Sequence, residues 1–384
     1  MYFEQAVAVD TVRFWHQLAL QIDVDEVVFA TTAKEELRDE SSTHELIESV
    51  LAGLREQPAR LRLLKCRDVT RFRAAQLNMA VEHARQHFVT TGTDKTKIWI
   101  GVYNADSRPH ASTFVELKDL LSVEPNTRMY QQLVDYVVPQ RPGTGLVAVG
   151  NSILQTWWTR SHYWARSTRG RRGHSSWAAT APYSTFGHGE FVRLDFLDEI
   201  GGFPNFAYAD GLLLGWICRL KDEPIGLLAS RDCAEVPRTA RDLVTQQTAW
   251  LRGLLNFDAT VRWCRAHGQL RLSRREVAVL QAQHLTIPVA WGLSSAAVVA
   301  GFVAVARRVG RGDSTAVDLV RLGVLVSYPL IPAVPGIGVH LREHRLTTRL
   351  LGAAASWTIE GLAFWPAFFG HLRRAQDAPA KTPR

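Results

Sequence analysis

Two kinds of segment alternate along the first third of the chain. Apolar, β-branched runs at residues 24–31, 61–65 and 97–103 predict strands. More polar stretches at residues 43–55 and 72–87, with helix-favouring composition and spacing, lie between them. This strand–helix–strand–helix–strand order predicts an α/β fold with a mostly parallel, Rossmann-like sheet.

The end of the third predicted strand carries polar side chains. Residues 97–103 run into a polar segment that contains Asn104, Asp106 and Ser107. In parallel α/β sheets, ligands bind beyond the carboxyl ends of the strands. An acidic loop there can hold a divalent cation, and the cation can bind a diphosphate. An Asp at a strand end is also a common turn residue, so both interpretations stay open at this point.

The last quarter of the chain contains three apolar runs, at residues 285–306, 322–341 and 350–370. A helix needs about 20 apolar residues to cross the hydrocarbon core of a bilayer. Short arginine-rich links separate the runs, so we predict about three membrane segments. The alternative is a set of buried helices in a soluble domain.

Two features complicate this membrane prediction. Pro329, Pro332 and Pro335 would break a regular helix in the second run, which is then kinked or re-entrant. Glu360 lies in the middle of the third run, where facing lipid would cost about 2.5–3.5 kcal/mol. We therefore expect Glu360 to face a protein or substrate cavity, or that helix to be partly solvated.

The charge distribution supports the membrane interpretation. The net charge of +8 belongs entirely to residues 270–384, with 14 basic against six acidic residues, because residues 1–269 hold 31 of each sign. Arginines that flank apolar runs are typical of membrane proteins, whereas a phosphate-binding face would need a basic soluble part. We expect no nucleic-acid partner.

The four cysteines and the N-terminus favour a domain that faces the cytosol. Cys66, Cys218, Cys233 and Cys264 lie far apart and show no zinc-binding spacing. Residues 1–15 lack the basic and apolar regions of an export signal. We therefore expect free thiols.

An aromatic segment precedes a basic loop in the middle of the chain. Residues 146–166 include Trp157, Trp158, Tyr163 and Trp164, and the loop 167–173 has the sequence STRGRRG. Aromatic residues gather where proteins meet lipid headgroups. A buried helix followed by a flexible loop is an equal alternative.

Further local features are each ordinary when taken alone. Gly187-His188-Gly189 and Gly201-Gly202 permit turns and close backbone approach. Asp210 precedes the apolar residues 212–214, where an Asp is usually a helix N-cap. Gln246 and Trp250 are four residues apart and share one face if the segment is helical.

The order and spacing of these features are more specific than any one of them. Over roughly residues 1–255 they resemble the membrane-integrated inverting glycosyltransferases of family 2, which include cellulose and hyaluronan synthases. Arg73-Ala74-Ala75-Gln76-Leu77-Asn78 looks like that family's KAxALN segment, and Asn104-Ala105-Asp106 looks like its DxD motif. Asp210 falls at its ED motif, and the segment from Gln246 to Trp250 looks like its QxxRW motif.

The resemblance implies a fold, an activity and a location. It implies a GT-A nucleotide-diphospho-sugar transferase domain, Mg²⁺ or Mn²⁺ as cofactor, and inversion at the anomeric carbon. The acceptor would be lipid-linked or a polysaccharide, as in cell-envelope polysaccharide biosynthesis. The enzyme would be a multi-pass protein of the cell (inner or plasma) membrane whose catalytic domain faces the cytoplasm.

The resemblance also assigns roles to particular residues. Asp210 would be the general base, and Asp106 would bind the metal ion. Those expected to bind the nucleotide-sugar are Glu4, Arg73, Asn104 and Asp106, and those expected to contact the acceptor or diphosphate are His188, Gln246, Trp250 and Arg252.

We expect four parts in the chain. The catalytic domain covers residues 1–255 and an interfacial helical linker covers 256–283. A membrane domain covers 284–372, and a polar tail covers 373–384. Met1-Tyr2-Phe3-Glu4 resembles the end of the family's first strand, so the first strand is expected to be truncated, through a start codon placed late or a true loss.

Three motif positions depart from the family pattern. Asn104 replaces the first acid of DxD, Ala209 replaces the Glu before Asp210, and Ala249 replaces the Arg of QxxRW. Asn104 can ligate a cation but brings no charge. The loss of the Arg of QxxRW removes a guanidinium that could bind a phosphate through two N–H groups. Arg252 or the loop 169–172 could supply the positive charge instead.

These departures place metal dependence and processivity in doubt, and two hypotheses from other classes remain beside the enzyme. The first is a membrane-anchored sugar-binding or scaffold relative without catalytic activity. The second is a transporter subunit, which is supported only by the apolar runs and Glu360.

Overall fold

A computed structural model of the 384-residue chain describes residues 5–38, 42–54, 60–68, 73–139, 144–160, 185–207, 209–313, 315–331 and 345–373. Glu4, Tyr163, Trp164, Tyr208, Pro332 and Pro335 lie outside the described residues, as do the basic loop and nearly all of the polar tail.

The N-terminal part has the alternating elements that the sequence predicts. Helix α1 (Gln5–Ala19) comes first, followed by β1 (Val27–Thr32), α2 (Thr43–Ala52), β2 (Leu61–Cys66), α3 (Arg73–Ala84) and β3 (Trp99–Val102). Helix α2 begins with a capping box, in which Ser42 and Glu45 satisfy each other's backbone N–H groups. The three strands and two helices expected here are therefore confirmed, with ends shifted by a few residues.

The sheet arrangement corrects the expectation of one mostly parallel sheet. Among the described residues, β1 and β2 form a separate parallel pair. The second sheet has the order β3-β5-β4-β6, in which β4 (Met129–Val137) runs parallel to β6 (Gly226–Glu235). Strand β5 (Glu190–Arg193) lies between β3 and β4 and is antiparallel to both. The fold is a mixed α/β fold whose larger sheet is itself mixed.

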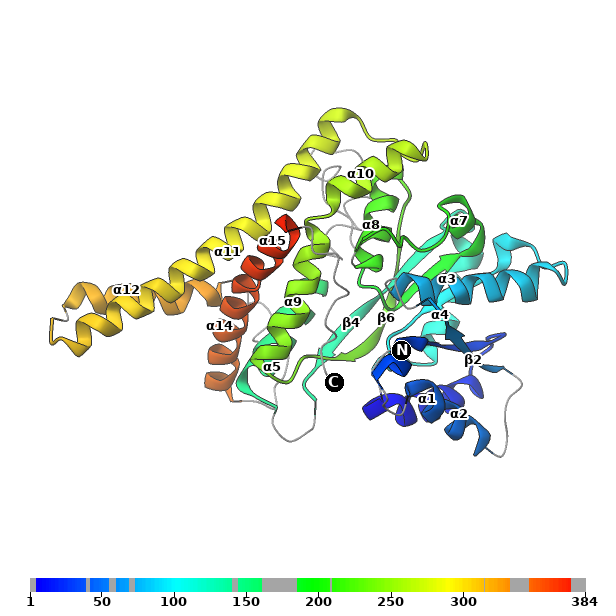
Figure 1. Ribbon diagram of the computed structural model, residues 1–384, viewed down its shortest axis with the longest axis horizontal. Coiled ribbons are helices and arrows are strands. Elements are labelled where there is room, and N and C mark those ends of the chain that lie inside the picture. Colours follow the sequence, from blue (N-terminus) through cyan, green and yellow to red (C-terminus); the bar gives the residue numbers. More distant parts are fainter. Residues whose placement is uncertain are drawn as a thin grey trace.

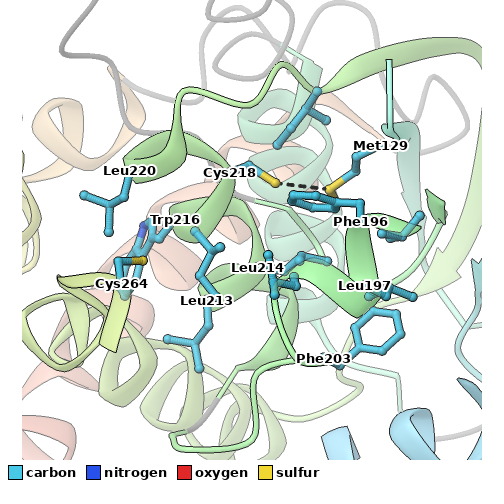
Figure 2. Packing of buried hydrophobic residues seen from close by; sticks show 14 of the residues in the cluster. Met129, Phe196, Leu197, Phe203, Leu213, Leu214, Trp216, Cys218, Leu220 and Cys264 are labelled. Atoms are coloured by element: carbon cyan, nitrogen blue, oxygen red, sulfur yellow. Dashed lines mark hydrogen bonds between the residues drawn. The ribbon is translucent and has the colours of Figure 1, made fainter. Parts of the chain in front are cut away.

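The main core lies on one face of the four-stranded sheet. Helices α7 (Leu194–Glu199), α8 (Asp210–Lys221) and α10 (Phe257–Ala266) contribute nearly half of its buried side chains. Trp216 is fully buried, with its ring 5.0 Å from that of Phe257. Figure 2 shows Cys218 of α8 pointing at Met129 of β4, with the two sulfurs 3.5 Å apart. This packing fixes the start of α8 against the sheet.

A second layer joins the C-terminal helices to the sheet. Helices α5 (Leu146–Trp158), α9 (Ala240–Leu254), α14 (Leu346–Leu362) and α15 (Phe364–Leu372) lie close together beside β4 and β6 (Figure 1). Gly150 of α5 and Gly352 of α14 allow direct backbone contact between these two helices. The third apolar run therefore packs on the sheet domain through buried residues such as Ala353 and Glu360.

Within the described residues, one helix is long and apolar enough to cross a membrane, α11 (Arg274–Gly310). The described part of the second run forms the end of α12 (Ala316–Ser327) and a 3-10 turn, Tyr328–Leu330, and the third run is divided between α14 and α15. The prediction of about three spanning helices is therefore not supported. Helix α11 also runs without a break across the expected boundary at residues 283–284. Together α11 and α12 project from the rest of the molecule as a hairpin (Figure 1).

The remaining elements connect these layers. Helix α4 (Ser112–Val123) packs beside β6, and short helical turns occupy Ala33–Arg38, Arg85–Val89 and Lys95–Lys97.

Candidate functional site

A cavity of about 1800 Å³ collects most of the residues that the sequence singles out. It lies beyond the carboxyl end of β3 and extends between α5, α9, α11 and α14. Its lining includes Arg73, Asn104, Asp106, His188, Asp210, Gln246 and Trp250. Arg252 does not line the cavity; its guanidinium lies beside Gly370 of α15. Its proposed contact with the acceptor is therefore not supported.

Asp210 is held at the first turn of α8. The preceding residue, Ala209, has a φ of +63°, a left-handed conformation that costs a non-glycine residue about 1–2 kcal/mol. A side chain at Gly211 would collide with the backbone of Gly187, so the start of α8 lies directly against the 187–189 loop. The Asp210 side chain is buried, with 8% of the residue exposed. Backbone strain and close packing at one carboxylate are typical of functional sites.

Arg73 binds Asp210 through two hydrogen bonds. Its Nη2 and Nε donate to the same oxygen, Oδ2, at 2.8 and 3.2 Å. The guanidinium also donates to the Asn104 side-chain oxygen at 2.8 Å and to the Gly187 carbonyl at 2.6 Å. Within the described residues no group donates to Oδ1 of Asp210. Arg73 therefore orients the carboxylate and leaves one oxygen toward the cavity.

Glu190 is a second buried acid beside this pair, and it was missed in the sequence. It starts β5, is fully buried, and accepts a hydrogen bond from the Gly187 N–H at 2.7 Å. Burial raises the pKa of Glu190, and the charge of Asp210 raises it further, against the opposing effect of Arg73. Its position in a glycine-rich turn at the start of a short strand gave no local signal of this environment.

The substitution Glu190→Gln is expected to stabilise the protein at neutral pH. A raised pKa means that the folded state favours the protonated acid, so wild-type stability falls as pH rises above the ordinary Glu pKa of about 4.3. The amide of the variant would accept the same N–H and would not titrate. We expect the melting temperatures of the two proteins to diverge between pH 4.5 and 8. Parallel profiles would show that Glu190 does not titrate as its environment implies.

His188 contacts a third buried acid. Its Nδ1 lies 3.0 Å from Asp232 Oδ2 and 3.4 Å from Ser107 Oγ. Asp232 of β6 is fully buried and also accepts the Arg108 N–H at 2.9 Å. Both side chains face the same ring nitrogen, so the three residues do not form a nucleophilic triad, in which base and orienting acid use opposite nitrogens. Asp232 was missed in the sequence because it lies inside a strand, far from any recognised motif.

Asp106 is the single carboxylate at the expected metal position. It is buried, and its Oδ2 accepts the backbone N–H of Glu235 at 3.1 Å. No cluster of three His, Cys, Asp or Glu side chains that could hold a metal ion occurs in the part of the chain that is described. Asn104, the other candidate ligand, has its oxygen bound to Arg73. Among the described residues, the expected motif position therefore offers the Asp106 carboxylate and no closed group of three ligands, which suits a cation shared with a substrate phosphate.

Gln246 and Trp250 lie on α9 at the other side of the cavity. The Gln246 side-chain oxygen accepts a hydrogen bond from Gln155 of α5 at 3.2 Å. Trp250 is 39% exposed and lines the cavity. Their placement four residues apart on one helix agrees with the sequence prediction.

No protein-family model and no curated protein matches the chain. Among solved structures, it is similar to "Mannosyltransferase PcManGT from Pyrobaculum calidifontis in complex with GDP-Man and Mn2+". The identity is 12%, the match covers 97% of this chain and 99% of the other, and the TM-score is 0.44. A similarity this distant leaves the function of the present chain to be argued from its own residues.

Proposed function

We propose that this protein transfers a sugar from a nucleotide-diphospho-sugar to a hydroxyl of a lipid-linked or glycan acceptor, with inversion. The observation that carries the proposal is the arrangement around Asp210. A buried carboxylate next to the strained backbone of Ala209 is oriented by Arg73, with one oxygen left toward a large cavity beyond a strand end. A carboxylate in such a position can act as a general base.

The proposed reaction is a single displacement. The acceptor hydroxyl gives its proton to Oδ1 of Asp210 while its oxygen bonds to the anomeric carbon. The bond between that carbon and the diphosphate oxygen breaks, and the nucleoside diphosphate leaves with the bonding electrons. Arg73 keeps Asp210 in place, and its positive charge lies near the site where the leaving group becomes more negative.

A divalent cation fits this site only if the protein and the donor diphosphate both ligate it. Asp106 would hold Mg²⁺ or Mn²⁺ together with the diphosphate of the donor, which is a usual way of binding Mg²⁺ in phosphate-transferring sites. When bound, the cation would neutralise charge on the diphosphate. Because Arg73 takes the Asn104 oxygen, we propose that Asn104 positions Arg73 and does not ligate the metal.

The test uses membranes or vesicles that contain the full chain. A panel of UDP-, GDP- and dTDP-sugars is offered with Mg²⁺ or Mn²⁺, and release of nucleoside diphosphate is measured. Release from one donor, dependent on the protein, is the expected result. No release with folded protein and a range of acceptors would reject the proposal.

A second candidate is a non-catalytic sugar-binding relative. Two observations favour it. The guanidinium of Arg73 already binds the side chains of both Asp210 and Asn104. Ala209 and Ala249 also stand where the family motifs have a Glu and an Arg. Such a protein would bind a nucleotide or sugar in a calorimetric titration but would release no diphosphate. The donor panel therefore separates the two.

We also propose that the α11–α12 hairpin inserts into the cell membrane, with the catalytic domain on the cytoplasmic side. Large apolar side chains on both helices are exposed, including Leu293, Val309, Leu319, Val320 and Val324. The last turn of α11 holds Arg307 and Arg308, and Arg311 follows it. Arg308 pairs with Asp318 of α12 at 3.1 Å. An exposed apolar patch with a basic end suits a bilayer and its anionic headgroups.

Replacing Leu319 and Val320 together by Glu is expected to reduce membrane binding strongly. These side chains are 72% and 67% exposed on α12, so the change leaves the packed part of the fold intact. Each acidic residue in a bilayer costs up to about 2.5–3.5 kcal/mol, so the vesicle-bound fraction should fall by roughly a hundredfold or more. The measurement is co-sedimentation with vesicles of phosphatidylethanolamine and phosphatidylglycerol.

Val123→Glu is the matched control, because Val123 is also 72% exposed but lies on α4, outside the hairpin. It should sediment like the wild type. Equal loss in both variants, or no loss in either, would contradict insertion of the hairpin.

A further inference from the structure

One arm of the cavity lies away from Arg73 and Asp210, between α5, α9, α11 and α14. An aromatic cluster forms part of its wall: Trp291 of α11, Trp357 of α14 and Tyr328. The rings of Trp291 and Trp357 are 6.2 Å apart, and that of Tyr328 is 5.3 Å from Trp357 in an edge-to-face arrangement. The Trp291 indole donates to the Trp357 carbonyl at 3.1 Å, which fixes the two helices to each other.

A ladder of polar side chains also borders this arm. Asn151 and Ser356 both donate to Oε1 of Glu360, at 2.7 Å each. Gln155 in turn donates to the Asn151 oxygen at 2.9 Å and to Gln246 at 3.2 Å. The ladder thus connects Glu360, deep on α14, to Gln246, whose neighbour one turn along α9 is Trp250. The expectation that Glu360 faces a cavity is met, since Glu360 lines this arm.

Two acceptor atoms of the ladder have no partner within the described residues. Oε1 of Gln155 is buried without a hydrogen bond, and no described residue donates to Oε2 of Glu360. Gln155 and Glu360 are only 7% and 4% exposed, and both line the cavity. A buried acceptor left without a donor is costly, so Oε1 of Gln155 favours a ligand that brings a donor, and Oε2 of Glu360 can accept a second one.

The chemistry of the arm selects one class of ligand. Hydroxyl groups would donate to Gln155 and Glu360, and flat aromatic rings offer surfaces for the apolar C–H faces of a pyranose. A hydrocarbon chain would cover the rings but would leave the buried Oε1 of Gln155 without a donor, which is costly. A phosphate would be repelled by Glu360.

We propose that this arm binds a sugar unit of the acceptor. Gln155 and Glu360 accept its hydroxyl protons, and Trp291 and Trp357 pack against its ring. This inference rests on the proposed function and names the acceptor class for the same site. It predicts that the chain extends or modifies an existing glycan or glycolipid and does not place the first sugar on a bare lipid phosphate.

The test measures binding without turnover. The full chain in vesicles is titrated with a panel of neutral disaccharides, namely cellobiose, maltose and the α-1,2 and α-1,6 mannobioses, and tryptophan fluorescence and calorimetry are recorded. At least one disaccharide is expected to bind. Glu360→Gln keeps the acceptor oxygen for Asn151 and Ser356, so the protein should fold, but the uncharged amide should weaken binding of that disaccharide about tenfold.

Two controls keep this result separate from the donor site. Glu48→Gln, at an exposed position of α2, should bind the disaccharide like the wild type. The dissociation constant of the nucleoside diphosphate should be unchanged in Glu360→Gln. Disaccharide binding with no diphosphate release from any donor would support this site while rejecting the proposed catalysis.

Two outcomes would overturn the inference. One is that no disaccharide in the panel binds folded protein. The other is that farnesyl phosphate, which carries no sugar, binds in competition with the disaccharides and is unaffected by Glu360→Gln. That second outcome would assign the arm to a lipid chain.

Discussion

Asp210→Asn should slow sugar transfer by a factor of about 10²–10⁴ while the protein stays folded and continues to bind its donor. Asn has nearly the shape of Asp but cannot take a proton from the acceptor. General-base catalysis by a placed side chain contributes about 10²–10⁴ in rate, so turnover should fall by that factor. Diphosphate release measured against acceptor concentration should show a lower kcat, with a similar KM for the donor.

The substitution also changes the partner of Arg73. In the wild type, two guanidinium N–H groups donate to Oδ2 of Asp210. Burial lowers the pKa of Arg73, but the charge and hydrogen bonds of Asp210 raise it by more, so the pKa lies above its ordinary value. Arg73 keeps its bonds to Asn104 and Gly187, and its side chain is 35% exposed, so it remains solvated in the variant. We therefore expect only a small loss of stability.

Asp258→Asn provides the matched control. Asp258 is an exposed acid on α10 that pairs with Arg262 on the same helix, outside the cavity lining. Its activity should equal that of the wild type. If Asp210→Asn retained full transfer activity, Asp210 would not be the base, and Glu190 would be the next acid to examine, because it lies beside the same loop.

The local parts of this fold could be predicted from the sequence, whereas the long-range parts could not. Apolar, β-branched runs with polar helical stretches between them predict the strands β1, β2 and β3. Strand β5 has only four residues, Glu190–Arg193, with a charged residue at each end, so its antiparallel insertion between β3 and β4 has no local signature. The order of the strands is set by contacts across the whole chain.

The site shows the same division. Resemblance to a family placed Arg73, Asn104 and Asp210 in one site, and the structure brings them into direct contact. It did not indicate that Arg73 would bind the other two. Glu190 and Asp232 were missed because a buried acid in a strand looks, in sequence, like an exposed one.

Apolar composition alone could not separate membrane helices from packed ones. The first run, which lies in α11, has 22 residues, and the third run, which forms most of α14 and α15, has 21. In the structure α14 packs on α5 through small residues, whereas much of the apolar surface of α11 is exposed. The small residues Gly150 and Gly352 are 202 positions apart (352 − 150), so only the folded chain reveals their pairing.

Gly150→Ala is expected to cause a large loss of stability. A methyl group at Gly150 would lie well inside the van der Waals radius of the Gly352 carbonyl and close to the Ala353 nitrogen. Backbone atoms cannot move aside as a flexible side chain can, so α5 and α14 would have to separate. Overpacking of a tight interface costs typically 1–3 kcal/mol, and we expect a loss of about 3 kcal/mol here, seen as a lower melting temperature.

Gly323→Ala is the matched control for this substitution, because Gly323 lies within α12 and a methyl group there meets no atom within 4 Å. Ala is favoured over Gly in a helix interior by about 1 kcal/mol, so this variant should be as stable as the wild type or slightly more stable.

The effect of Gly150→Ala should extend to the site, since Asn151 and Gln155 are on the same helix and bridge to Glu360 and Gln246. Disaccharide binding should therefore weaken in Gly150→Ala at temperatures where the protein is still folded. Equal melting temperatures for the two glycine variants would show that α5 and α14 do not pack in this way, and the polar ladder between them would lose its basis.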